Sequence, residues 1–205
     1  MSTDSILSDI SSIQRAITEL AENQSLLKKI DNIDLDFVSG FHFVGIGKSY
    51  IAASKTAASL RSLGFMSSAY NAVDYLHGDI GNVSFDQGDL VFFISNSGTT
   101  TEVINAICYT NELLNSYDRS NGDLYLISSG RIEDHLIRQD NQLIYDRVEE
   151  MCPNSIILPN TSVLITMLIG DLITNKIIRY KQVSRSDFAK NHPGGNIGSK
   201  TWIHR

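Results

Sequence analysis

Cysteines are few in this chain, and no set of residues has the spacing of a metal site. The 205 residues include only Cys108 and Cys152, which stand far apart. Two isolated thiols in a chain of this size are typical of reduced core residues rather than of a disulfide framework. The sequence also holds no HxxE, HxxxH or CxxC pattern. We therefore expect no metal site in this chain.

Long apolar runs and clusters of positive charge are absent as well. No segment has the unbroken apolar length of a membrane span, and the first twenty residues lack the apolar core and cleavage site of a secretory signal. The 17 Lys and Arg residues against 23 Asp and Glu residues give a formal net charge of −6. Without a basic cluster, this balance argues against a nucleic-acid surface. We expect a cytoplasmic protein with neither a nucleic-acid nor a membrane partner.

What the sequence does contain is an alternation of strand and helix patterns. Helical spacing of apolar residues follows or separates the strand patterns over 47–63, 103–114, 132–137 and 159–181. The strand patterns themselves cover 41–45, 66–70, 90–94, 123–128 and 142–145. This alternation predicts a doubly wound α/β domain with a mostly parallel five-stranded sheet flanked by helices.

The two ends of the chain lie outside this alternation. Residues 4–31 place isoleucines and leucines at mostly helical spacing, which predicts one amphipathic helix or two, packed on the domain or on a partner subunit. We expect a single domain over 1–205, with an N-terminal helical segment at 1–35. The glycine-containing tail at 186–205 is expected to be irregular.

A hydroxyl-rich turn follows the apolar run at 90–94. Serines, threonines, an asparagine and a glycine fill 95–101, where a predicted strand ends and a helix begins. Free N–H groups and the helix dipole favour an anion at such a place, so the turn predicts a phosphate site. The alternative is an ordinary helix cap.

A second turn, at 45–49, also favours an anion. It fails as a P-loop because His42 stands where that loop needs a glycine, and Tyr50 replaces the third glycine of the dinucleotide fingerprint. Gly47 and Lys48 still lie near a helix N-terminus. Because both turns end strands of one predicted sheet, one shared phosphate site becomes a stronger hypothesis than either turn alone supports.

Several acids and histidines have two interpretations each. Glu102 is either a functional group or an acid that complements a helix dipole. Glu150 follows a predicted strand and is harder to explain as a solvent-facing side chain. A lone histidine such as His77 or His192 is more often structural than catalytic. The other three look incidental: His42, His135 and His204.

Five motifs together resemble those of the D-arabinose-5-phosphate isomerases, which are sugar isomerase (SIS) domain proteins. The resemblance runs in order over about residues 41–200. The motifs are Gly45-Ile46-Gly47-Lys48-Ser49, His77-Gly78-Asp79-Ile80-Gly81, Ser95-Asn96-Ser97-Gly98 with Glu102, Glu150-Met151-Cys152-Pro153 and His192-Pro193-Gly194-Gly195-Asn196-Ile197-Gly198.

The resemblance implies an aldose–ketose isomerase that needs no cofactor and interconverts D-ribulose 5-phosphate and D-arabinose 5-phosphate. Glu150 would be the base, with Glu102 in reserve, Lys48 would stabilise an enediolate, and His192 would move protons on the sugar oxygens. It also implies a homotetramer in which His192 acts on a neighbouring subunit's site. The implied substrate-binding residues are Gly47, Ser49, His77, Ser95, Asn96, Ser97 and Thr100.

Three departures from the family pattern leave alternatives open. Thr99 stands where the family usually has an acid, Asn160-Thr161-Ser162-Val163 replaces a more hydroxyl-rich run, and the sequence ends soon after the last motif, so we expect no paired CBS domains. The alternatives are another SIS phosphosugar isomerase and a non-catalytic phosphosugar-binding regulatory module. Whether the implied product serves lipopolysaccharide or capsule synthesis, by way of 3-deoxy-octulosonate, is left open.

Overall fold

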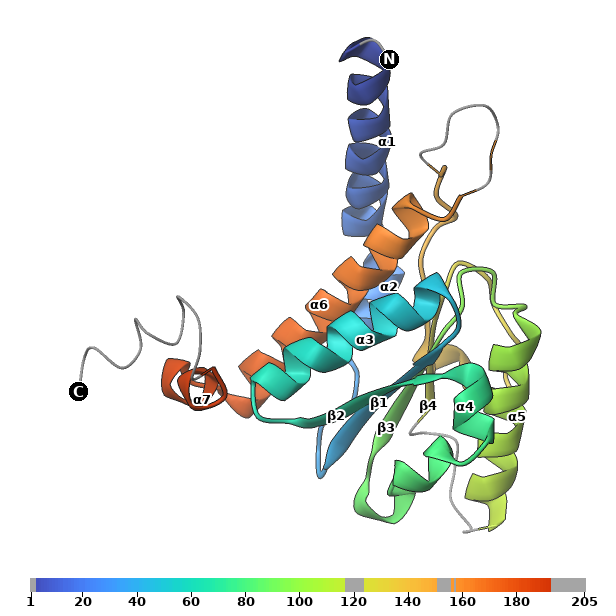
Figure 1. Ribbon diagram of the computed structural model, residues 1–205, viewed down its shortest axis with the longest axis vertical. Helices are drawn as coiled ribbons and strands as arrows, with labels where there is room; N and C mark the ends of the chain where they lie inside the picture. Colours follow the sequence, from blue (N-terminus) through green and yellow to red (C-terminus); the bar gives the residue numbers. More distant parts are fainter. Residues whose placement is uncertain (1–2, 117–123, 151–155, 157, 193–205) are drawn as a thin grey trace.

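A five-stranded parallel sheet forms the centre of the computed structural model, which describes residues 3–116, 124–150, 156 and 158–192 (Figure 1). The strand order is β2-β1-β3-β4-β5, and every neighbouring pair is parallel. The strands are β1 (Gly40–Gly45), β2 (Met66–Asn71), β3 (Leu90–Ile94), β4 (Leu124–Ser128) and β5 (Gln142–Ile144). The predicted fold class is therefore confirmed, with a sheet that is wholly parallel.

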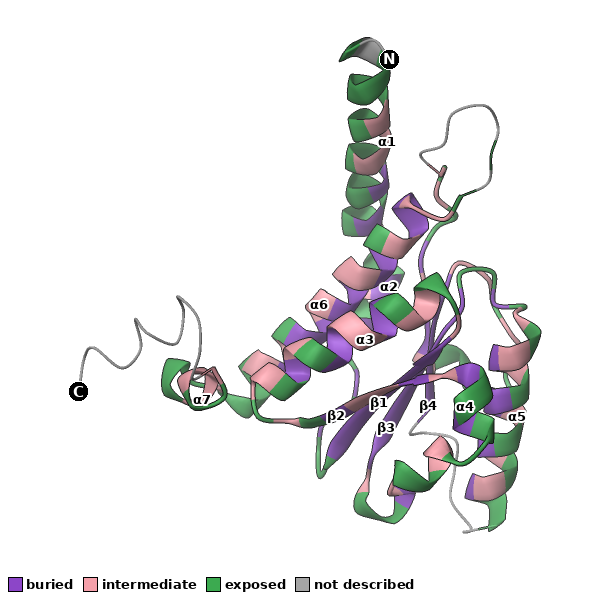
Figure 2. Cartoon of the chain, viewed as in Figure 1, coloured by how far each residue is buried: buried purple, intermediate pink, exposed green. Residues whose placement is uncertain are grey.

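Alternate residues of the central strands face two separate apolar cores. Phe92 of β3 stacks between Phe43 and Tyr125 on one face, with ring centroids 5.1 and 4.9 Å apart. The neighbouring Phe93 points into the other core and meets Tyr75 edge-on. Strands β1, β3 and β4 are buried throughout (Figure 2). Burial on both faces is why these strands have continuous apolar runs rather than alternating ones.

Helices cover both faces of the sheet. Helices α3 (Lys48–Ser62) and α6 (Thr161–Lys181) lie side by side on one face, and α4 (Ala72–Leu76) and α5 (Thr101–Ser116) cover the other (Figure 1). Short 3-10 helices η1 (Asp79–Asn82), η2 (Phe85–Gln87) and η4 (Gln139–Asn141) lie in the connections. A Cβ added to Gly170 of α6 would lie 2.1 Å from Thr56 Oγ1 of α3, so only glycine permits this approach of the two helices.

By length and composition, helix α6 is apolar enough to cross a membrane. Its isoleucines at 165, 169, 173 and 177 recur every four residues and are buried in the core shared with α3 and the sheet. Half of its apolar window is buried within the protein. Core helices of globular domains pass the same test of length and composition, and α6 occupies the position of one.

The N-terminal segment forms two helices, α1 (Thr3–Glu22) and α2 (Gln24–Asp31). They are separated at Asn23, whose side chain accepts a hydrogen bond from Leu26 N at 3.0 Å and caps α2. Only the end of α1 packs on the domain, through Ala16 and Leu20, and the rest projects away from the sheet (Figure 1).

Two sequence-based predictions of local structure were wrong. Residues 132–137 form turns instead of a helix because the buried Gln142 side chain bonds the backbone there. It accepts from Ile132 N (3.1 Å) and donates to the carbonyls of Ile132 (3.0 Å) and Ile137 (2.8 Å). The tail predicted to be irregular begins with helix α7 (Arg185–Lys190), stabilised by a capping box between Ser184 and Asp187. Residues 193–205 lie outside the described part.

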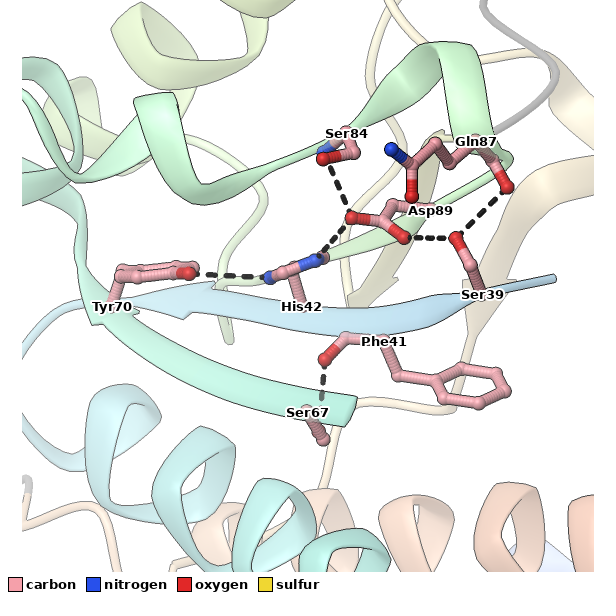
Figure 3. A network of polar contacts seen from close by, with 8 residues as sticks. All are labelled: Ser39, Phe41, His42, Ser67, Tyr70, Ser84, Gln87 and Asp89. Carbon is pink, nitrogen blue, oxygen red and sulfur yellow. Dashed lines mark hydrogen bonds and ion pairs between the residues drawn. The ribbon is translucent and has the colours of Figure 1, made fainter. Parts of the chain in front are cut away.

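A buried ionisable pair joins β1 to the start of β3 (Figure 3). His42 Nε2 lies 2.8 Å from Asp89 Oδ2, and both side chains are 1% exposed. Burial lowers the pKa of His42, against the opposing effect of Asp89. Burial alone would raise the pKa of Asp89, but hydrogen bonds from Ser39 and from Ser84 N, together with His42, hold it below its usual value. The expectation that His42 is incidental was therefore wrong: it belongs to a structural network.

Candidate active site

The carboxyl ends of the parallel strands gather the predicted site residues at one edge of the sheet, where ligands bind in such folds. A pocket of about 200 Å³ lies there, between the N-terminal ends of α3 and α6. It is lined by Ile46, Lys48, Ser49, Ala52, Asn96, Pro159, Ser162, Val163 and Thr166. Three predicted residues, Lys48, Ser49 and Asn96, therefore share this space with the beginning of α6.

Two larger cavities lie elsewhere. One, of about 480 Å³, includes Asp34, Asp86 and Arg138 and lies towards the amino ends of the strands. The other, of about 570 Å³, lies between the Ile80–Phe85 connection and the later turns of α5. Neither includes a predicted site residue, so the smaller pocket is the candidate site.

The hydroxyls of the loop at 95–100 divide into two groups. Ser95 is 2% exposed; its Oγ lies 2.9 Å from Thr100 Oγ1 and accepts from Gly98 N at 3.2 Å, so this pair holds the loop together. Ser97 is exposed, and its Oγ accepts from Thr99 N (3.1 Å) and Thr99 Oγ1 (2.9 Å). Ser97 thus lies on the solvent side, ahead of the N-terminus of α5, where an anion would approach.

The end of β4 holds this loop firmly. The Asn96 carbonyl accepts from Ser129 N (2.9 Å) and Ser129 Oγ (2.7 Å), and Tyr145 OH donates to Asn96 Oδ1 at 2.7 Å. A Cβ on Gly130 would lie 2.1 Å from the Ser97 carbonyl oxygen. The hydroxyl loop is therefore fixed against β4 before any ligand arrives.

Glycines shape the turn after β1. Gly47 has φ 57° and ψ −125°, a backbone conformation that other residues rarely adopt, and it precedes the first residue of α3. Lys48 is exposed at that N-terminus, and within the described residues its ammonium has no hydrogen-bond or ion-pair partner. The turn thus presents a cation beside the pocket.

The two predicted glutamates differ in how they are held. Glu150 Oε2 accepts from Asn160 N at 2.7 Å and from Ser162 N at 3.3 Å, so this carboxylate caps the beginning of α6. Glu102 lies half-buried in the first turn of α5, and no described residue pairs with its carboxylate. Both acids lie at the carboxyl edge, and Glu150 adjoins the pocket through Ser162.

Sequence analysis missed two polar residues near the pocket and gave no role to a third. Thr166 Oγ1 donates to Ser162 O at 2.8 Å and lies 3.4 Å from Tyr145 OH. Burial raises the pKa of Tyr145 to about 12, so this phenol stays protonated as a donor to Asn96. The hydroxyls at 161, 162 and 166 recur on one buried helix face, a signal that could have indicated the site.

The structure does not bring the two predicted histidines into the pocket. His77 is exposed at the end of α4. His192 stacks on Phe188 at the end of α7, with ring centroids 3.9 Å apart, and the adjacent Asn191 approaches Gly64 at the end of α3. It therefore lies at the far ends of α3 and α6, roughly 20–30 Å along those helices from the pocket, at about 1.5 Å per residue.

Among the described residues, no group of three or more His, Cys, Asp or Glu side chains could hold a metal ion. Cys108 is free and half-buried in α5, and Cys152 lies outside the described part. The polar groups around the pocket are an ammonium, hydroxyls, an amide and a carboxylate. Such a set is suited to binding a polyhydroxylated anion and to moving protons on it.

Comparisons with known proteins agree with this arrangement. A Chlamydia muridarum protein whose name states no function is 35% identical over 160 residues, or 77% of this chain and 45% of that protein. The protein named arabinose 5-phosphate isomerase KpsF from Escherichia coli is 28% identical over 204 residues, covering 93% of this chain and 60% of its own length. The chain thus spans about half the length of such relatives.

The fold likeness extends over nearly the whole chain. A structure from E. coli CFT073, solved in complex with a phosphosugar, has a TM-score of 0.77 at 24% identity and covers 94% of this chain and 100% of its own. Residues 41–114, which include β1, β3 and the hydroxyl loop, match the family model for the SIS domain. The sequence match and the parallel fold together identify the chain as a SIS-domain protein.

Proposed function

We propose that this protein is an aldose–ketose isomerase that interconverts D-ribulose 5-phosphate and D-arabinose 5-phosphate. The observation that supports it most is the pocket itself: the Lys48 ammonium, the loop at Asn96 and the helix capped by Glu150 surround one space. Among relatives, one is named arabinose 5-phosphate isomerase. The activity would reside in the cytoplasm, where a phosphorylated sugar is retained by its charge.

The phosphate would bind at the hydroxyl loop. Ser97 is exposed there, ahead of the N-terminus of α5, while the Ser95–Thr100 pair keeps the loop in shape. The helix dipole and free N–H groups favour an anion at this point. Binding energy from the phosphate then fixes the reacting carbons against the catalytic groups.

The reaction removes a proton from a carbon beside a carbonyl, forms an enediolate and returns the proton to the neighbouring carbon. Glu150 would carry the proton, because it is the carboxylate that adjoins the pocket through α6. Lys48 would stabilise the negative charge that develops on the enediolate oxygen. Proton transfer within the substrate needs no cofactor.

His192 would serve a neighbouring subunit's site in a homotetramer. Within one chain it lies at the other ends of α3 and α6 from Lys48, so it does not complete the pocket beside it. In the neighbouring site it would move protons on the sugar oxygens or open the cyclic aldose.

The test is an assay of the purified protein with D-ribulose 5-phosphate that follows aldose formation. Glu150→Gln should lower kcat by about 10²- to 10⁴-fold, the usual contribution of a positioned acid–base group. Glu102→Gln should have the smaller effect. Glu149→Gln is the matched control, because Glu149 is exposed and pairs only weakly with Arg15 at 3.5 Å.

Other outcomes separate the alternatives. Full activity in Glu150→Gln with loss in Glu102→Gln would reverse the assignment of the base. Turnover of a different ketose phosphate would replace the substrate but keep the isomerase. Phosphosugar binding without turnover of any would favour the regulatory binding module.

A further inference from the structure

The Ser162 hydroxyl is buried without a hydrogen-bond partner. Ser162 is 1% exposed, and in the described part of the chain its Oγ has no donor or acceptor within reach. Two threonines on the same helix show the ordinary solution: Thr166 and Thr174 each donate to the carbonyl four residues earlier, at 2.8 Å. An unpaired buried hydroxyl costs free energy and is rare in native proteins. Ser162 is therefore the exception on its helix.

This hydroxyl belongs to the lining of the pocket. Ser162 lies in the first turn of α6 and faces the same space of about 200 Å³ as Lys48, Ser49 and Asn96. A water molecule occupies about 30 Å³ of liquid, so the pocket has room for a short polyhydroxylated chain. The lost hydrogen bond can thus be recovered from a bound ligand.

The surroundings indicate which part of a ligand Ser162 suits. The N-terminus of α6 already has an anion, because Glu150 Oε2 accepts from the N–H groups of Asn160 and Ser162. A second negative group beside that carboxylate would be repelled. A hydroxyl both donates and accepts, so Ser162 matches a neutral hydroxyl or carbonyl oxygen rather than a phosphate.

We propose that Ser162 is a substrate-binding residue that hydrogen-bonds a hydroxyl or carbonyl oxygen of the sugar chain, while the phosphate lies at the hydroxyl loop. This inference rests on the proposed function and assigns the space between α3 and α6 to the carbon chain. Asn96 belongs both to the loop and to the pocket lining, so one ligand spans the two. A chain held in this way lies between Lys48 and the helix capped by Glu150.

The variant Ser162→Ala tests this assignment, with calorimetric titration of D-arabinose 5-phosphate and of inorganic phosphate as the two probes. The Kd for the phosphosugar should rise about 3- to 10-fold, as expected for one neutral hydrogen bond. The Kd for inorganic phosphate should stay unchanged. The melting temperature of the free protein should stay the same or rise, because the variant removes an unsatisfied buried hydroxyl.

Thr174→Ala is the matched control, since Thr174 is buried on the same helix but already bonds Gly170 O and lies outside the pocket. It should leave both Kd values unchanged. An unchanged phosphosugar Kd in Ser162→Ala, with or without a lower melting temperature, overturns the assignment. Equal weakening of both probes also overturns it and places Ser162 on the phosphate.

Failure of the proposed function gives a different result. A wild-type protein that binds D-arabinose 5-phosphate without isomerising D-ribulose 5-phosphate contradicts the isomerase, whereas the Kd comparison still supports or overturns the role of Ser162. A wild-type protein that binds neither probe overturns both proposals.

Discussion

An alanine at position 130 would disturb the hydroxyl loop without touching any of its side chains. The added Cβ would lie 2.1 Å from the Ser97 carbonyl oxygen and 3.0 Å from its carbon. Side-chain Cβ atoms essentially never approach closer than 3.0 Å, so the loop and the end of β4 must separate by about 1 Å. Both contacted atoms belong to the backbone, so no rotation of a side chain relieves the clash.

The cost of this separation can be estimated for stability and for activity. Overpacking typically costs about 1–3 kcal/mol, and each kcal/mol lowers Tm by about 2–4 °C in a chain of this size. We therefore expect Gly130→Ala to melt about 2–12 °C lower than the wild type. A displacement of 1 Å can cost about 10²-fold in rate, so kcat/KM for D-ribulose 5-phosphate should fall by about 10- to 100-fold.

Thermal unfolding and steady-state kinetics measure the two effects. Gly81→Ala is the matched control for stability, because no atom lies within 4 Å of the Cβ it would add and Gly81 is exposed. If Gly130→Ala kept both the Tm and the kcat/KM of the wild type, the close packing of the loop on β4 would not hold the site, and the reasoning would be refuted.

Two further predictions concern pH and subunits. Burial lowers the pKa of His42 below 6.5, so the unfolded chain binds more protons there and the free energy of unfolding should fall as pH drops through 6.5. His42→Gln, which keeps a donor for Asp89, should reduce that fall between pH 7.5 and 5.5 in urea titrations, and an unchanged pH dependence would contradict it. Separately, co-expressed Lys48→Ala and His192→Ala subunits should recover activity that neither has alone, since hybrid tetramers would contain sites with both residues intact. Mixed subunits that stay inactive would place His192 in its own chain's site.

The sheet could be predicted from the sequence because each central strand is buried on both faces. A run such as Leu90 to Ile94 leaves little choice of structure, and the predicted strand has the bounds of β3. The helix predicted over 132–137 failed for a tertiary reason. Gln142, from the following strand, supplies hydrogen bonds that the backbone would otherwise make along a helix.

The candidate site was predictable only where it follows a strand. Lys48 and Asn96 follow β1 and β3, which are adjacent and parallel, so the fold class alone brings their turns together. The contribution of α6 depends on how a helix more than 60 residues further along the chain crosses the sheet, and local spacing does not determine that. The pairing of His42 with Asp89, 47 residues apart, escaped prediction for the same reason.

The contacts of Glu150 connect positioning with chemistry. Two N–H groups hold Oε2 in place, and a catalytic group fixed in this way reacts from a defined position. The same N–H groups compete with a substrate proton for that oxygen, so Glu150 must take the proton on its other oxygen or release the start of α6. Release would move Ser162, because its N–H is one of the two donors. In Glu102, which no described residue restrains, neither constraint applies. A base at Glu150 therefore links proton transfer to the grip of Ser162 on the sugar, and a base at Glu102 does not.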